Sequence, residues 1–232
     1  MTPTSTGSRS QLRATQSAAI KGVARRLIAD KGVADLSLRE VSREMGMVSS
    51  ALYRYFATRD ELLTALIYDA YNELGGVVER AEARVPRSQT RARWRSACGA
   101  VRKWAKAHPH EYALLFGTPV PGYVAPNVTI AAATRVPTVL AHILSDAVAR
   151  HATSVSTSAN QVDVRDFLQV DALVPSMPNV APELFVRALM AWTTLFGTVS
   201  FELFGHYVGS VTSYPQMFDA VVEELADFVG LQ

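Results

Sequence analysis

The sequence has very little cysteine and almost no net charge, and each shortage limits the class of protein. Cys98 is the only cysteine, so the chain can form neither an intramolecular disulfide nor a metal cluster held by several thiolates. Apolar neighbours at helical spacing predict that this thiol is buried and unreactive rather than a redox sensor. The net charge of +2 is too small to indicate nucleic acid or any other partner by itself.

The motifs of common enzyme classes are also missing. The chain has no Gly-rich phosphate loop, no nucleophile elbow and no zinc-ligand spacing. Among the five histidines, His206 follows Glu202 by one helical turn, a spacing that suits a metal-ligand pair or a base with its orienting carboxylate. No third ligand accompanies them, so we interpret them as a polar pair in a pocket or an interface. The sequence therefore predicts no enzymatic activity, no cofactor and no metal site.

Signals for export are absent, and one segment raises the question of a membrane. The N-terminal segment MTPTSTGSRSQLR lacks the apolar core of a secretory signal, so we expect a cytoplasmic protein. The apolar run from Leu184 to Phe204 is long enough to cross a bilayer. It contains Arg187 and Glu202, however, and no basic segment follows it. We favour a helix buried on two sides within a soluble assembly, and we expect no membrane partner.

What the sequence does contain is helical periodicity from end to end, which predicts an all-α fold. A helix is expected from about Gln11 to Lys31, and a second one begins at Ser37, where Ser37 and Glu40 form a capping box. Gly46 ends that second helix, and only a short turn separates it from the next. Two short helices joined by a tight glycine-containing turn are the signature of a helix-turn-helix DNA-binding motif.

The segment VSSALYRYF, at 48–56, is predicted to be the helix that enters the major groove. Its helical wheel divides it into an apolar face and a polar face. The apolar face contains Val48, Ala51, Leu52, Tyr55 and Phe56, and the polar face contains Ser49, Ser50, Tyr53 and Arg54. Serines allow a close approach to the bases, while tyrosine and arginine can reach phosphates or a guanine edge.

The distribution of charge agrees with this placement. Residues 1–59 hold 10 Lys and Arg against 4 Asp and Glu, a balance of +6, and the remainder of the chain has a balance of −4. A positive field near the recognition helix suits phosphate binding. A basic face that is merely solvated remains the alternative interpretation.

Here the chain resembles a known family. The run KGVADLSLREVSREMGMVSSALYRYFATRDELLTALI is similar to the DNA-binding domain of the TetR family of bacterial transcriptional regulators. The matching positions are Ser37, Gly46, Ser49, Leu52, Tyr53, Phe56, Arg59 and Glu61. The sequence departs from the family pattern at Tyr55, where histidine is usual, and at Arg59, where lysine is commoner. The segment HPHEYALLFGTPVPGY also resembles the WHG-like ligand-domain signature of one subgroup.

The resemblance implies two domains, and the sequence after the motif continues to predict helices. We expect a helix-turn-helix domain at 10–57 and a helical ligand-binding and dimerisation domain at 58–232. A second capping box, Thr58 to Glu61, opens the latter. Pro137 should kink or split a helix at 130–148. The further elements expected are helices near 94–105 and from 109, a loop at 118–126, a long connection at 151–181, and final helices at 182–207 and 215–229.

Specific residues are assigned to each role. Ser49, Ser50 and Arg54 are predicted to contact base edges, and phosphates are assigned to Ser37, Tyr53, Tyr55 and Arg59. Aromatic side chains are predicted to line a ligand cavity, although core packing is the alternative for each of them. They are Trp94, Trp104, Tyr112, Phe116, Tyr123, Trp192 and Phe196. The cavity is implied chiefly by the family resemblance, as is a homodimer formed by the helices at 182–207 and 215–229.

Together these features predict a transcriptional repressor. Such a protein would bind a palindromic site in double-stranded DNA as a homodimer and would leave it when a small apolar or aromatic effector binds. One alternative is an activator or a regulator that responds to no ligand. An alternative of another class is a small-molecule binding protein whose DNA-binding domain is degenerate.

Overall fold

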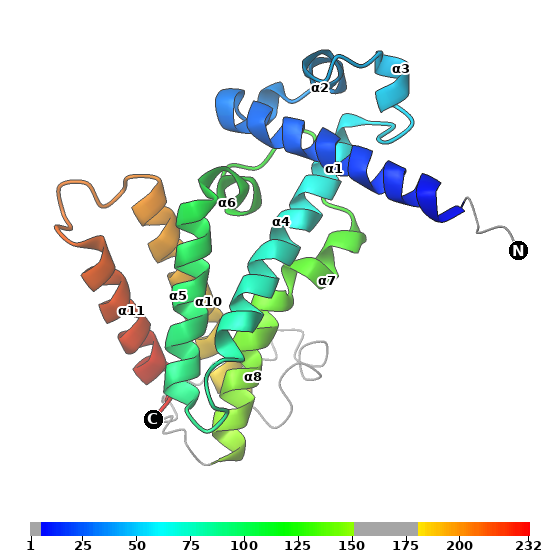
Figure 1. The fold of residues 1–232 in the computed structure, drawn as a ribbon. Helices are drawn as coiled ribbons and strands as arrows, with labels where there is room; N and C mark the ends of the chain where they lie inside the picture. The colour runs from blue at the N-terminus through cyan, green and yellow to red at the C-terminus, as the bar shows by residue number, and fades with distance from the viewer. Residues whose placement is uncertain (1–5, 151–180) are drawn as a thin grey trace, which may run out of the picture. The chain divides into compact units, whose positions relative to one another are not determined.

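The computed structural model describes residues 6–150 and 181–232, and within this part every regular element is a helix, as predicted (Figure 1). The connection expected at 151–181 lies almost wholly outside the described residues. The elements in order are α1 (Thr6–Lys31), η1 (Val33–Asp35), α2 (Leu38–Glu44), α3 (Ser49–Leu52), α4 (Arg59–Glu82), α5 (Thr90–Ala107), α6 (Pro109–Phe116), η2 (Asn127–Thr129), α7 (Ile130–Ala133), α8 (Arg135–Ala149), α10 (Pro182–Leu203) and α11 (Tyr214–Phe228).

These elements form two compact units. The first unit contains the chain up to Tyr71 together with His110–Ile130, and the second contains Asn72–Pro109 and the residues from Ala131 onward. Helix α4 contributes its first half to one unit and its second half to the other. The domain boundary predicted after residue 57 marks the end of the helix-turn-helix motif, whereas the compact units divide further along, within α4.

The core of the first unit forms where the apolar stripe of α1 meets α2, α3 and the start of α4. The predicted stripe of α1 is buried throughout, and it comprises Ile20, Val23, Ala24, Leu27 and Ile28. Leu38, Val41 and Leu52 complete the cluster from the next two helices. Lys21 and Arg25 of α1 both pair with Asp69 of α4, at 2.6 and 3.1 Å. The small motif is thus held by one apolar core with an ionic contact at its edge.

Helix α5 is the central element of the second unit, because it contacts α8, α10 and α11 (Figure 1). The indole of Trp94 is buried and donates its N–H to the carbonyl of Val222 at 3.1 Å. Cys98 is fully buried in the same core, and burial raises the pKa of its thiol far above the ordinary value. The thiol is therefore unreactive, as the sequence predicts.

A buried arginine joins three helices of the second unit. The side chain of Arg93, in α5, is only 2% exposed and pairs with Glu82 of α4 and with Asp146 of α8, the latter at 2.6 Å. Arg87 pairs with the same Asp146 at 2.7 Å. A buried guanidinium is tolerated only when carboxylates surround it in this way, so these partners fix the register of the three helices.

The helix expected at 130–148 is indeed divided, but the prediction placed the break at the wrong residue. The two helices α7 and α8 meet at Thr134 with a bend of 43°. Pro137 lies in the first turn of α8, where backbone N–H groups have no hydrogen-bond acceptor within the helix, so the N–H that proline lacks costs no helical hydrogen bond. The break therefore precedes the proline by most of a turn.

Helix α10 is the one described helix that is by itself long and apolar enough to cross a bilayer, since Glu183–Leu203 has a mean hydropathy of 1.4. Two of its charged residues are nevertheless held by neighbouring helices. Glu202 pairs with Arg102 of α5 at 2.6 Å, and Arg187 donates to the carbonyl of Phe228 at 2.9 Å. The helix ends at Leu203, earlier than the predicted end near 207. It contacts α5, α8 and α11, although only 33% of its apolar window is buried within the described residues.

Candidate nucleic-acid interface

The turn between α2 and α3 has the geometry that a helix-turn-helix motif requires. Gly46 has φ +63°, a left-handed conformation that glycine adopts without strain. Its N–H donates to the carbonyl of Arg43 at 3.1 Å, and the next N–H, of Met47, donates to Ser42 at 2.9 Å. This pair of bonds is the Schellman motif, which ends a helix and redirects the chain within two residues. The predicted helix end at Gly46 is confirmed.

Ser37 begins α2 as predicted, although only half of the capping box is present. The hydroxyl oxygen of Ser37 accepts the N–H of Glu40 at 3.2 Å. The Glu40 carboxylate does not reach back, because it pairs with Lys31 and, at 3.2 Å, with Arg43. These contacts hold the pKa of Glu40 below its ordinary value, chiefly through the hydrogen bond from Lys31. Ser37 therefore orients α2, and its phosphate contact stays a prediction.

The recognition helix is shorter than the predicted segment 48–56, because α3 covers only Ser49–Leu52 and Tyr53 is its C-cap. The polar side chains predicted for this segment are nevertheless exposed. Ser49, Ser50 and Arg54 are all exposed, and Tyr53 is 45% exposed. Beneath them the hydroxyl of Ser49 is hydrogen-bonded to that of the buried Ser42, at 3.1 Å. The three side chains assigned to base edges and Tyr53, assigned to a phosphate, therefore lie on one short segment.

Val48 is placed differently from the prediction. The helical wheel assigns it to the packed face, but it is 72% exposed. It is the N-cap residue of α3 and has extended backbone angles, φ −68° and ψ +136°, so helical periodicity does not apply to it. An exposed apolar side chain directly before Ser49 is suited to contact the methyl group of thymine. The sequence signal was available, since Gly46 already marks the residues after it as a turn.

The side chains of Tyr55 and Arg59 are held by contacts within the first unit, unlike the exposed side chains of this surface. Tyr55 is partly buried against the core of the first unit. The guanidinium of Arg59 donates to the carbonyl of Leu36 at 3.0 Å and to that of Val33 at 2.9 Å. Arg59 therefore fixes the segment between α1 and α2 to the start of α4. The phosphate contacts proposed for these two residues remain predictions.

The predicted capping box at the start of α4 is present in a modified form, because Glu61 bonds to the residue before the N-cap Thr58. The hydroxyl of Thr58 accepts the N–H of Glu61 at 3.1 Å, and the Glu61 carboxylate accepts the N–H of Ala57 at 2.7 Å. The helix that carries Arg59 is therefore fixed at its first residue.

The aromatic residues predicted to line a ligand cavity are divided between the two units. Tyr112, Phe116 and Tyr123 belong to the first unit, where Tyr112 and Phe116 lie 5.0 Å apart and Tyr123 shares a hydrogen bond with Thr64 at 3.0 Å. Trp94, Trp104, Trp192 and Phe196 belong to the second. The ring of Trp192 lies 5.9 Å from that of Phe196. Each set is packed within its own unit, and the common cavity stays a prediction.

Glu202 and His206 do not act as a pair. Glu202 is almost completely buried and pairs with Arg102 and, at 3.2 Å, with Lys106. Burial raises the pKa of Glu202, but the hydrogen bonds from the two cations outweigh it and leave the pKa below its ordinary value. The ring of His206 lies 4.9 Å from that of Phe201. Their interpretation as a polar pair is therefore wrong, because α10 ends before His206.

In the described residues every regular element is a helix, and α2, the tight turn at Gly46 and the exposed α3 form a helix-turn-helix motif, the arrangement typical of DNA-binding proteins. Residues 20–66 match the family described as bacterial regulatory proteins of the tetR family, and residues 94–225 match the tetracyclin repressor-like C-terminal domain. The chain belongs to the TetR family of bacterial transcriptional regulators.

Relatives and solved structures agree with this assignment. HTH-type transcriptional regulators of Mycobacterium tuberculosis and Mycobacterium bovis are each 36% identical over 224 residues, which cover 92% of this chain and 92% of theirs. The crystal structure named for regulatory protein SCO4313 is 31% identical and covers 94% of this chain and 98% of its own, with a TM-score of 0.76. The chain is thus a DNA-binding transcription regulator with the architecture of its family.

Proposed function

We propose that the protein is a repressor that binds a palindromic operator as a homodimer and leaves it when a small apolar or aromatic effector binds. The observation that carries the proposal is the exposed surface of residues 48–54, where Ser49 and Ser50 of α3 lie between Val48 and Arg54 in the sequence. Ser49, Ser50 and Arg54 would contact base edges, and Val48 would contact a thymine methyl group. Backbone phosphates would be bound by Tyr53, with Ser37, Tyr55 and Arg59 as further predicted contacts. In that role the protein works in the cytoplasm, without a membrane partner and without catalytic activity.

The exposed apolar residues of the second unit support the homodimer. Met190 is 51% exposed and Phe201 is 48% exposed on α10, and Leu189 and Phe204 are exposed with them. Large side chains exposed in this number along one helix indicate a surface that a partner covers. Two copies of α10 and α11 would form a four-helix interface, which brings two recognition helices to one duplex.

The aromatic residues of the helical domain support an effector. The proposed effector site draws on the set in the second unit, where the buried N–H of Trp192 has no hydrogen-bond partner within the described residues. A ligand would act by favouring a dimer in which the recognition helices are wrongly spaced, with α4 as the continuous element that has residues in both units. A coupling free energy of about 1–3 kcal/mol would suffice.

The proposal is tested by sequencing the DNA that the purified full-length protein selects from a random pool. A palindrome with half-site centres about 34–36 Å apart is expected. A selected site without two-fold symmetry would contradict the homodimer, and the failure to select any sequence would contradict operator recognition. The Val48→Ala variant should lose its preference for thymine at one position of each half-site and keep the others. Repeating the selection with apolar and aromatic compounds tests whether an effector releases the DNA.

A further inference from the structure

A groove on the second unit lies between the second half of α4 and α5. Its volume of about 430 Å³ falls within the range of small-molecule sites, roughly 300–1,000 Å³. Of the aromatic residues predicted to bind a ligand, only Trp104 lines it. The lining residues that matter here are the cations Arg80, Arg84 and Lys103, the small residues Ala81, Gly99 and Ala107, and the rings of Trp104 and His108.

One part of the groove is apolar and open. At Gly99 an added Cβ would meet no atom within 4 Å, so this position offers free space. The rings of Trp104 and His108 are stacked, with centroids 5.1 Å apart and an interplanar angle of 25°. Trp104 itself is only 2% exposed, so the aromatic surface that a ligand can reach is the half-buried ring of His108 that stacks on it. A flat ligand against His108 and the small residues would bury apolar surface.

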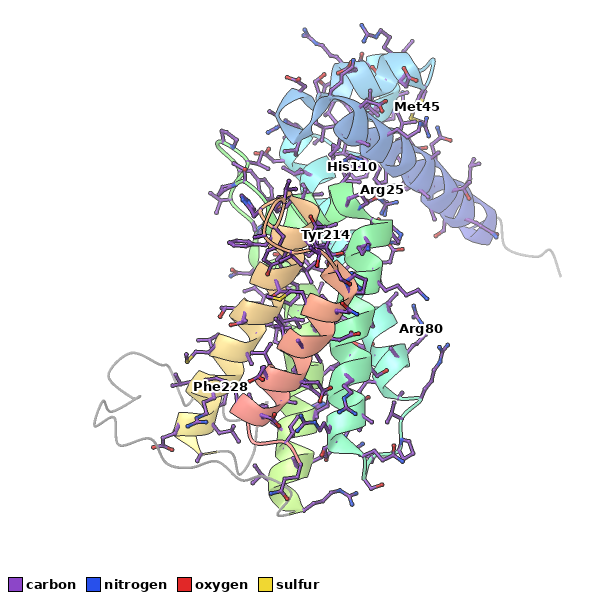
Figure 2. The ribbon with its side chains drawn as sticks, turned by 90° about the vertical axis from the view of Figure 1, so that its left-hand side faces the viewer. Arg25, Met45, Arg80, His110, Tyr214 and Phe228 are labelled. Carbon is purple, nitrogen blue, oxygen red and sulfur yellow. The ribbon has the colours of Figure 1, made fainter. Side chains whose placement is uncertain are left out.

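The rim of the groove is positive. Arg80, Arg84 and Lys103 are exposed, and across the described residues no carboxylate lies within 4.0 Å of any of them. Other arginines of α5 are paired, as Arg93 is with Asp146 and Arg102 with Glu202. Arg84 and Lys103 differ from them in having no such partner among the described residues, whereas the charge of Arg80 helps to lower the pKa of Glu79. One carboxylate, that of Glu73, lies 3.5 Å from Nε2 of His108. Arg80 lies across the unit from Phe228 of α11, so the groove is on the side away from that helix (Figure 2).

We propose that this groove binds a small organic anion with a flat apolar group, such as an aromatic carboxylate. The aromatic group lies on the small residues and the ring of His108, and the carboxylate is bound by the cations of the rim. The site is separate from the DNA-contacting surface of the first unit and does not depend on the effector response proposed above. A neutral molecule of the same shape would leave the rim charges without a partner, so the groove selects for charge as well as shape.

Calorimetric titration of the full-length protein with 2-naphthoate and with its neutral counterpart 2-naphthamide tests the proposal. We expect 2-naphthoate to bind at least tenfold more tightly than 2-naphthamide. Gly99→Leu, which fills the groove, should weaken 2-naphthoate binding at least tenfold, whereas Gly99→Ala should leave it unchanged. Both substitutions replace a helical glycine and should preserve the fold, which thermal unfolding verifies.

The charge is tested with the double variant Arg84→Gln and Lys103→Gln. We expect at least a tenfold loss of 2-naphthoate affinity, while Arg150→Gln, an exposed change outside the groove, should have no effect. The proposal is overturned if 2-naphthoate gives no binding at about 1 mM, if 2-naphthamide binds equally well, or if Gly99→Leu has no effect. It is also overturned if the double variant loses affinity for DNA and not for 2-naphthoate, since the groove would then bind phosphates. Gly99→Leu should select the same DNA sequences as the wild type. A loss of 2-naphthoate binding without a change in DNA selection would therefore test the groove independently of the proposed repressor function.

Discussion

At the scale of single residues, Tyr53 and Arg54, which directly follow the recognition helix α3, should have different effects on DNA binding. Arg54→Ala should cost about 1–3 kcal/mol and relax the preference at one base position, because arginine reads a guanine edge. Tyr53→Ala should weaken binding to every sequence by a similar factor, because a phosphate contact carries no sequence information. Affinities measured by fluorescence anisotropy on the selected site and its single-base variants would show this difference. Identical specificity profiles for the two variants would contradict the assignment.

Two substitutions of Arg59 distinguish a structural role of this residue from a contact with a DNA phosphate. Arg59→Lys keeps the charge but cannot span the carbonyls of Val33 and Leu36, so it should lower the free energy of unfolding by about 1–2 kcal/mol. Urea denaturation measures this loss.

The salt dependence of DNA affinity supplies the complementary measurement for Arg59. If Arg59 acts only within the fold, Arg59→Gln should leave the slope of log affinity against log salt unchanged. A slope smaller by about 1 would indicate that its guanidinium turns outward to a phosphate in the complex.

Single residues also show why part of the site was predictable and part was not. Gly46 and Ser37 act within a few residues of themselves, so their roles follow from local sequence. Arg59 bonds to carbonyls more than twenty residues away, and no local pattern contains that information. Val48 was misplaced because a helical wheel was extended one residue beyond the helix.

At the scale of helices, α11 is joined to α5 by ion pairs whose strength depends on pH. Hydrogen bonds from Arg95 and then from Arg91 lower the pKa of Glu223 to about 2. Because the pKa is depressed on folding, this stabilisation is present above the unfolded value near 4.5 and is lost as the pH falls toward 2. Glu223→Gln should therefore destabilise the protein by about 1 kcal/mol at pH 7, and the difference should shrink below about pH 4.5.

Urea midpoints at pH 7, 5 and 3.5 test the contribution of Glu223. The neighbouring Glu224 is exposed, and Glu224→Gln serves as the control on the same helix. A difference between wild type and Glu223→Gln that stays constant from pH 7 to pH 3.5 would show that the ion pairs do not stabilise the helix contact.

Helix periodicity predicted the elements themselves well, and their ends less well. The stripe on α1 gave the core of the first unit because each residue of the stripe is buried. The break between α7 and α8 was placed at Pro137 because proline was treated as an interruption, although it is well suited to a first turn. The sequence could not show which of the predicted ligand-binding aromatic residues belong to the same compact unit. Periodicity indicates which residues face a core, but it does not indicate which of the two cores they face.

At the scale of the whole molecule, the proposed repressor would depend on the distance between two identical DNA-reading helices. The dimer surface proposed on α10 and α11 sets that distance, and the effector would alter it. The sequence predicted the class of protein because local helix signals and family resemblance agree over the motif. It could not predict the groove between α4 and α5, which is formed by residues from two helices and has no linear motif.

The most direct test of the account is the stoichiometry and affinity of the protein on the selected palindrome, compared with the same duplex carrying five extra base pairs between the half-sites. Half a helical turn places the second half-site on the opposite face of the DNA. We predict two chains per palindrome and an affinity at least about tenfold lower for the extended duplex, by anisotropy and sedimentation. One chain per duplex, or equal affinity for both duplexes, would contradict the claim that the dimer reads two half-sites at a fixed spacing.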